Sequence, residues 1–182
     1  DSSTSRGLGD VYKRQSGKCE FYSARLAAQG LDGLPDHLPN YELQGSDARY
    51  PLAMISPPAR NFLNSTFVNV TSLRNIEGRP ILEIHPDDAE ARGIANDAVV
   101  RVFNDRGSYL CHATVSRRAR PGVVNGLGIW WRKLGLNGTN VNEVTSQALT
   151  DLGRAPTFYD CLVEVEAADA SMEAGANAST TA

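Results

Sequence analysis

The segment from Ala98 to Ser116 constrains the fold more than any other part of this sequence. It contains two apolar runs, Ala98–Phe103 and Ser108–Ser116, separated only by the polar turn Asn104-Asp105-Arg106-Gly107. Two β-prone runs on either side of a short, glycine-containing turn are typical of a β-hairpin. We therefore expect a hairpin over residues 98–116.

Other short apolar runs, each followed by a turn signal, predict further strands. Several short strands with closely spaced turns favour a β-barrel carrying short helices. The sequence has no glycine-rich strand–loop–helix fingerprint of a Rossmann or P-loop unit. The fold class is therefore expected to be mainly β with short helices. The further strand candidates are Leu52–Ile55, Ile81–Ile84, a strand beginning at Val123-Val124, and Phe158–Val165.

One short helix is predicted between His85 and Gly93. Pro86 suits a helix start, Asp87 and Asp88 suit a first turn, and Gly93 suits a helix end. The histidine and the acids could suggest a metal or acid–base site, but the proline, the acids and the glycine already have structural roles at the helix ends.

The two ends of the chain differ in character from its centre. Residues 1–15 have no periodicity, and part of this segment looks like a translated sequencing adaptor, so we expect it to be non-native. Residues 16–49 are interpreted as an arm from an upstream domain, with a short strand at Lys18–Tyr22 and a short helix at Ser23–Gln29. Residues 50–166 form the compact domain. Residues 167–182 are mostly small and polar, and this tail is expected to be disordered.

Composition excludes some classes of protein. A net charge of -3 argues against a general nucleic-acid binder, and no apolar run approaches the ~18 residues that span a bilayer. Arginine outnumbers lysine, which suits a phosphorylated ligand, although genomic base composition is a simpler explanation. Cys19, Cys111 and Cys161 lack metal-site spacing, so no iron–sulfur or zinc site is expected in this chain, and Cys111 and Cys161 are expected to be buried thiols.

The motifs of the central region, read in order, resemble the C-terminal molybdopterin-dinucleotide-binding domain of the dimethyl sulfoxide reductase family of molybdopterin oxidoreductases. The resemblance implies a double-psi β-barrel, of the aspartate-decarboxylase-like kind, that closes over a molybdopterin guanine dinucleotide (bis-MGD) cofactor with molybdenum or tungsten. Residues 16–22 also resemble the segment that precedes this domain. The motifs are Tyr50–Arg60, Leu63–Thr66, Ile84–Ala89, Gly93-Ile94, Val100–Gly107, Arg120–Val123, Trp130-Trp131, Val141–Thr145 and Phe158–Asp160.

Two neighbouring motifs carry candidate cofactor-binding residues. The resemblance places the Ser56-Pro57-Pro58-Ala59-Arg60 loop along the pterin dinucleotide, where Ser56 and Arg60 offer donors for phosphate or pterin oxygens. The alternative is a solvated turn with a surface arginine. Asn64 and Ser65 offer amide and hydroxyl groups for a pterin edge. Their alternative roles are a helix cap or a glycosylation sequon.

The remaining candidates lie nearer the C-terminus. Asn142 matches a family asparagine that hydrogen-bonds the cofactor, and Tyr159 lies where the family again touches it. A capping asparagine and a packed tyrosine are the structural alternatives. Trp130 and Trp131, if on a strand, would point to opposite faces, so that Trp130 could face the ligand, although core packing of both is the alternative.

The resemblance implies that this chain is the C-terminal fragment of a molybdenum or tungsten oxidoreductase. No catalytic residue and no metal ligand is expected within it, and any iron–sulfur cluster would belong to the upstream part. The expected partners are the upstream domains of the same polypeptide and electron-transfer subunits, without nucleic acid or direct membrane insertion. The alternative is a stand-alone β-barrel binding or assembly module without cofactor. The substrate and the choice between molybdenum and tungsten stay open. The compartment, which could be the cytoplasm or the periplasm of a prokaryote, stays open as well.

Overall fold

The computed structural model of this chain describes residues 21–34, 36–39, 42 and 49–168. The chain divides into two compact units, residues 1–39 and 40–182. In the first unit, α2 (Ala24–Ala27) lies within the predicted helix, and the Ser23 hydroxyl caps it by accepting from the Leu26 amide. The predicted non-native segment, most of the predicted strand at residues 18–22, and nearly all of the predicted tail lie outside the described residues.

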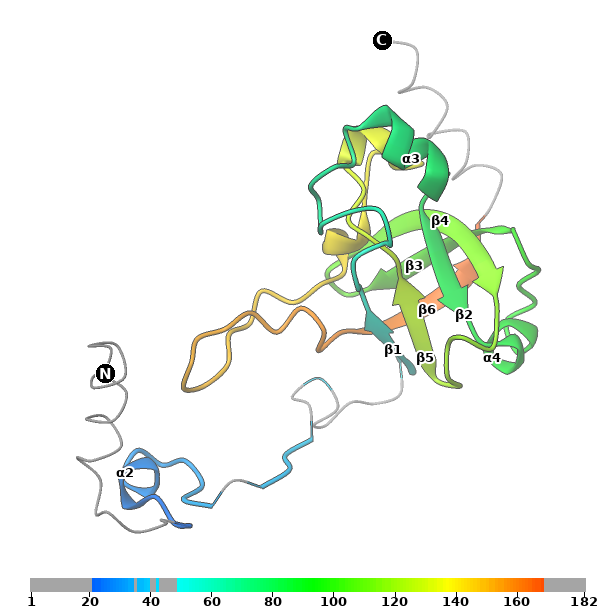
Figure 1. Ribbon diagram of the computed structural model, residues 1–182. Coiled ribbons are helices and arrows are strands. Elements are labelled where there is room, and N and C mark those ends of the chain that lie inside the picture. The colour runs from blue at the N-terminus through cyan, green and yellow to red at the C-terminus, as the bar shows by residue number, and fades with distance from the viewer. Residues whose placement is uncertain (1–20, 35, 40–41, 43–48, 169–182) are drawn as a thin grey trace. The chain divides into compact units, whose positions relative to one another are not determined.

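The second unit is built on a closed barrel of six short strands (Figure 1). Around the barrel the strands follow the order β1, β5, β2, β4, β3, β6, and β6 pairs back to β1. The prediction of a mainly β fold is confirmed. The strands are β1 (Leu52–Ile55), β2 (Ile81–Ile84), β3 (Val99–Asn104), β4 (Gly107–Val115), β5 (Val123–Gly126) and β6 (Leu162–Ala167).

The strand pairing relates the first three strands to the last three. β1 runs parallel to β5, and β4 runs parallel to β2. β1 is antiparallel to β6, and β4 is antiparallel to β3. Exchanging β1 with β4, β2 with β5, and β3 with β6 therefore leaves the pairing unchanged, because the β2–β5 and β3–β6 pairs map onto themselves. This interleaving of two three-strand halves agrees with the double-psi barrel that the family resemblance implies.

The barrel interior is filled by alternate side chains of these strands. In β3, for example, Val100 and Val102 are completely buried while their neighbours are partly exposed. Burying an aliphatic side chain contributes roughly 1.5–3 kcal/mol, so each of these alternating side chains stabilises the barrel. The largest buried side chains of the barrel strands are Leu52, Met54, Leu82, Ile84, Val100, Val102, Cys111, Val124, Val163 and Val165. Cys111 and Cys161 are buried free thiols, as predicted.

The predicted helix before β3 is present as α4 (Pro86–Glu90). His85 precedes it, and its Nδ1 accepts from the Asp87 amide at 3.2 Å, so the ring works as a helix cap. A turn follows the helix and ends at Gly93, whose positive φ of 64° suits glycine. The prediction of a short helix in this segment is confirmed, and the capping role of His85 is an addition from the structure.

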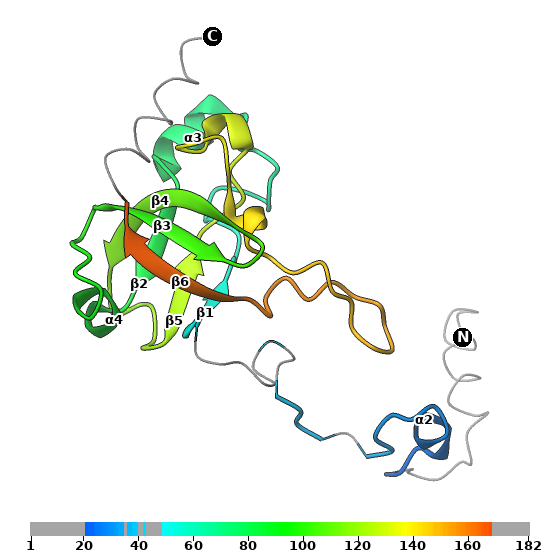
Figure 2. The same ribbon diagram turned by 180° about the vertical axis from the view of Figure 1, so that it is seen from behind.

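A second layer packs on one end of the barrel (Figure 2). It contains α3 (Thr71–Glu77), which the sequence did not predict, and the short 3-10 helix η1 (Arg132–Leu134). A separate apolar cluster of Ala59, Phe62, Val68 and Trp130 holds this layer together.

Two local expectations needed correction, and one further element was not predicted. Trp130 and Trp131 do not lie on a strand but in the segment between β5 and η1. β6 begins at Leu162 rather than Phe158, because the residues before it turn away from the barrel. Asn142 lies in a 3-10 helix, η2 (Val141–Glu143), which was not predicted. Among the described residues, no helix is long and apolar enough to cross a membrane.

Candidate functional site

A groove of about 470 Å³ opens beside the barrel, lined by three segments and by Ile129, which follows β5. The first follows β1, the second runs from η2 into a loop that projects from the barrel (Figure 1; Figure 2), and the third returns from that loop to β6. The volume falls within the range of small-molecule sites, about 300–1,000 Å³. The lining residues are Ser56, Asn64, Ile129, Asn142, Thr145, Ser146, Gln147, Ala148, Leu149, Pro156, Phe158 and Tyr159.

Four predicted site residues line this groove: Ser56, Asn64, Asn142 and Tyr159. They come from segments up to about a hundred positions apart in the sequence, as residues 56 and 159 illustrate. Ser56 is nearly buried at the end of β1, whereas the other three are exposed. The structure therefore brings half of the predicted set to one place.

Backbone conformation holds Asn64 in the groove wall. Its φ is 53°, a left-handed value that asparagine tolerates better than most residues. The turn around it is closed by two backbone hydrogen bonds between Leu63 and Thr66, at 2.8 and 3.2 Å. The Trp131 indole N–H also donates to the Ser65 carbonyl at 2.8 Å, which fastens the turn to the second layer.

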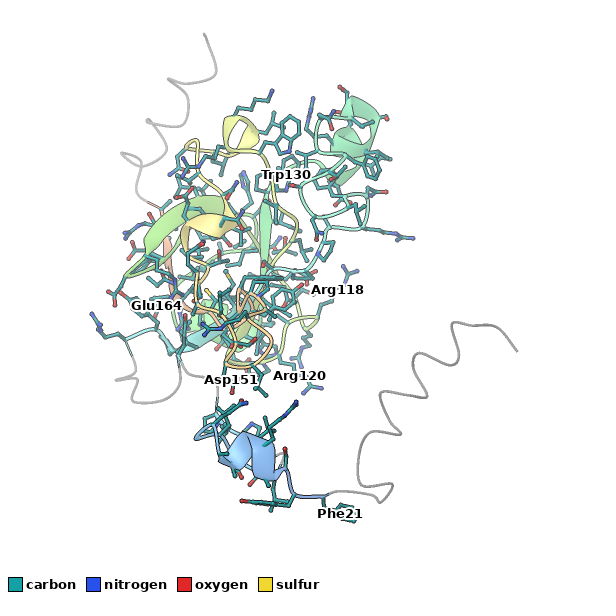
Figure 3. The ribbon with its side chains drawn as sticks, turned by 90° about the vertical axis from the view of Figure 1, so that its left-hand side faces the viewer. Phe21, Arg118, Arg120, Trp130, Asp151 and Glu164 are labelled. Atoms are coloured by element: carbon teal, nitrogen blue, oxygen red, sulfur yellow. The ribbon has the colours of Figure 1, made fainter. Side chains whose placement is uncertain are left out.

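The remaining four predicted residues do not line the groove. The Pro57 carbonyl accepts from the Gly128 amide, and Arg60 is exposed on the same loop. Ser65 is exposed on the turn next to Asn64. Trp130 is only 5% exposed, packs edge-to-face on Phe62 at 5.2 Å between ring centroids, and lies on the side of the barrel that carries the second layer (Figure 3).

The groove combines polar edges with apolar faces and carries no formal charge. None of its twelve lining residues is an acid, lysine, arginine or histidine. Serine, threonine, asparagine and glutamine side chains can both donate and accept hydrogen bonds. Phe158 and Tyr159 pack edge-to-face at 4.5 Å and are 39% and 47% exposed. Such a lining suits a flat, uncharged heterocycle with donor and acceptor groups on its edge.

Sequence reasoning missed part of the polar wall, Thr145-Ser146-Gln147, and the ring of Phe158. Three consecutive side chains with hydrogen-bonding groups follow the predicted Asn142 closely, which was a usable signal. Thr145 donates from its hydroxyl to the Asn142 carbonyl at 3.2 Å, so the wall is internally bonded.

Two groups behind the wall have shifted pKa values. Burial raises the pKa of the Cys161 thiol to about 11, although the Arg106 guanidinium opposes the shift. Burial lowers the pKa of Arg106, but the hydrogen bond and charge of Glu42 outweigh it, so the net pKa is raised. Cys161 is therefore a neutral thiol and Arg106 a cation near neutral pH. Over the described part of the chain, no group of three His, Cys, Asp or Glu residues could hold a metal ion.

Residues 52–162 match the protein-family model described as "Molydopterin dinucleotide binding domain". The matched region covers the barrel strands up to the start of β6 and the whole groove.

Several curated proteins are similar to this chain over most of its length. The "Probable oxidoreductase YoaE" of Bacillus subtilis is 36% identical over 83% of this chain and 22% of its own length. The "Dimethyl sulfoxide reductase DmsA" of Escherichia coli is 34% identical over 83% of this chain and 20% of its own length. The chain thus spans about a fifth of the length of these relatives.

The fold is also found in a solved structure. Acetylene hydratase from Pelobacter acetylenicus superposes with a TM-score of 0.68, covering 84% of this chain and 24% of that chain. The sequence identity is 19%, so this likeness concerns the fold alone.

Proposed function

This chain belongs to the molybdopterin dinucleotide-binding domain family of the dimethyl sulfoxide reductase type, and we propose that its groove holds one heterocyclic end of a molybdopterin guanine dinucleotide. The observation that carries the proposal is the uncharged lining, which combines hydrogen-bonding side chains with exposed aromatic faces. Pterin and guanine are flat and neutral, and both present donors and acceptors along an edge.

The residues present fit this group. Amide side chains at Asn64 and Asn142 can each donate and accept, which is what the edge of a pterin or guanine requires. The Tyr159 ring offers an apolar face, and the Ser56 hydroxyl completes the polar rim. The groove has no cation for a pyrophosphate, so we assign phosphate contact to the neighbouring loop, where Arg60 is exposed.

Pro57, Ser65 and Trp130 have a supporting role in this proposal. Pro57 and Ser65 shape the loop and turn that present Arg60 and Asn64, and Trp130 packs beneath them in the second layer. When bound, the cofactor would supply two-electron redox chemistry at molybdenum or tungsten. The residues of this chain would bind and orient it, and none of them is proposed as catalytic.

We further propose that the whole protein is an oxidoreductase in which this chain is the C-terminal part. The names of the similar proteins support this reading, and their much greater length supports further domains in the same polypeptide. Any iron–sulfur cluster and any electron-transfer subunit would lie outside this chain.

Calorimetric titration of the chain with metal-free molybdopterin guanine dinucleotide tests the binding proposal. We expect saturable binding that Asn142→Ala weakens by about tenfold, the effect of roughly 1–1.5 kcal/mol from one hydrogen bond. Asn75→Ala, an exposed asparagine on α3 outside the groove, is the matched control and should change nothing.

Binding that is equal in wild type and Asn142→Ala would place the ligand elsewhere. No binding by the wild-type chain, with or without the upstream domains supplied separately, would reject the proposal. It would favour the alternative of a β-barrel module without cofactor.

A further inference from the structure

The Val144 carbonyl oxygen is the most heavily bonded acceptor behind the groove. It accepts from Asn104 Nδ2 at 2.9 Å, from Arg106 Nε at 2.7 Å and from the Cys161 thiol at 3.2 Å. Val144 is completely buried, and the next residue, Thr145, begins the polar wall. Three donors on one carbonyl fix the point from which this wall departs.

The same hairpin also holds the opposite wall. Asn104 Nδ2 donates a second hydrogen bond, at 2.9 Å, to the carbonyl of Leu162, just after the segment that bears Phe158 and Tyr159. The Leu162 amide donates at 2.7 Å to Glu42, whose carboxylate pairs with Arg106 at 2.6 Å. Asn104 therefore bonds directly to Val144 and Leu162, which flank the two wall segments. Arg106 bonds to Val144 directly and reaches Leu162 through Glu42.

Turn formation alone does not explain these contacts. The β3–β4 turn needs only the bond from the Arg106 amide to Asn104 Oδ1, at 3.0 Å. The donors of Asn104 and Arg106 bond instead to carbonyls 38 to 58 positions further along the chain. Neither side chain lines the groove.

We propose that Asn104 and Arg106 are positioning residues that set the separation and orientation of the two groove walls. The proposal rests on the proposed function for its biological meaning, since the groove is taken to be the ligand site. It makes the β3–β4 hairpin, which touches no ligand, a determinant of ligand affinity.

The test compares hydrogen exchange and ligand binding in the full chain and in Asn104→Asp. Aspartate keeps the Oδ1 acceptor of the turn but cannot donate to the two carbonyls. The amides of Ala148, Thr157 and Asp160, which are hydrogen-bonded within the walls, should exchange about tenfold faster. The amide of Ala113 in β4 should keep its protection.

Arg106→Lys is a second variant, which keeps a cation for Glu42 and loses the Nε donor. It should open the first wall, at Ala148, more than the second. Affinity for metal-free molybdopterin guanine dinucleotide should fall by about tenfold in Asn104→Asp, with a smaller loss in Arg106→Lys.

The control is Asn125→Ala on β5, where a half-buried asparagine donates to Glu83 at 3.1 Å, away from the groove. Unchanged wall exchange in both hairpin variants would overturn the proposal. Equally accelerated wall exchange in Asn125→Ala would also overturn it, since the effect would then be general destabilisation. Failure of the wild-type chain to bind the ligand would reject the proposed function, while the exchange data would still decide the positioning role.

Discussion

Replacing Gly107 by alanine should displace one wall of the groove, although Gly107 itself does not line it. A Cβ atom at this position would lie 2.9 Å from the Glu143 carbonyl oxygen and 3.5 Å from the Glu143 Cβ. The nearest neighbour is backbone, which cannot rotate aside as a side chain can. η2 would have to move away by a few tenths of an ångström, and it carries Asn142 in the groove wall.

The cost follows from overpacking, since an extra methyl group in a packed site typically destabilises by about 1–3 kcal/mol. Gly107 has no positive φ, so backbone strain adds nothing to this figure. Urea unfolding of both proteins would give the loss in free energy of unfolding, and the same ligand titration would report the displaced Asn142. We expect weaker binding together with reduced stability.

Gly153→Ala is the matched control. Its Cβ would meet only the Thr150 hydroxyl at 3.7 Å, an ordinary contact, and its φ is not positive either. Stability in this control should stay within about 0.5 kcal/mol of wild type. Unchanged stability and binding in Gly107→Ala would show that η2 does not pack against the hairpin as described.

Two further predictions concern single side chains. Because burial raises the pKa of Cys161 from 9.0 to about 11, the neutral thiol is favoured in the folded state. Its contribution, on the order of 2–3 kcal/mol, should be complete below about pH 9 and lost between about pH 9 and 11. Between these pH values the free energy of unfolding should fall less steeply in Cys161→Ala than in wild type. Curves of equal slope would contradict the raised pKa of Cys161. At Asn64, glycine should keep the turn and lose only ligand affinity, whereas alanine should also lose about 1 kcal/mol because its φ of 53° is left-handed. Equal stability of the two variants in thermal unfolding would refute this reasoning.

Local sequence patterns predicted those elements that form through interactions among neighbouring residues in the chain. The β3–β4 hairpin follows from two alternating apolar runs around one turn, and α4 from a proline, two acids and a closing glycine. α3 escaped prediction because its stability comes from Leu73 packing on the second apolar cluster, and that cluster unites residues far apart in the chain. The order of strands around the barrel is likewise a property of distant pairs such as Ala53 with Val123.

The candidate site also has residues that the sequence could predict and supporting contacts that it could not. Ser56, Asn64, Asn142 and Tyr159 could be proposed because each lies in a motif of the family resemblance, and the fold gathers them in one groove. Their roles toward a ligand stay predictions. The hydrogen bonds of Asn104 and Arg106 to Val144 and Leu162 could not be predicted from the sequence. Asparagine and arginine are common in turns, and the sequence of a turn does not show whether their side chains reach distant carbonyls.

The interleaved halves of the barrel have a consequence for the order in which it folds. β1 finds its two neighbours only in β5 and β6, which lie about 70 and 110 residues later in the chain. Contacts of such long sequence separation slow folding, because the chain must lose loop entropy before they form. Until β6 is in place, β1 and β3 both present unpaired edges, which are sites where chains associate with one another. Pairing of β6 therefore covers both edges at once, and a chain without β6 would keep two open edges through which its copies could associate.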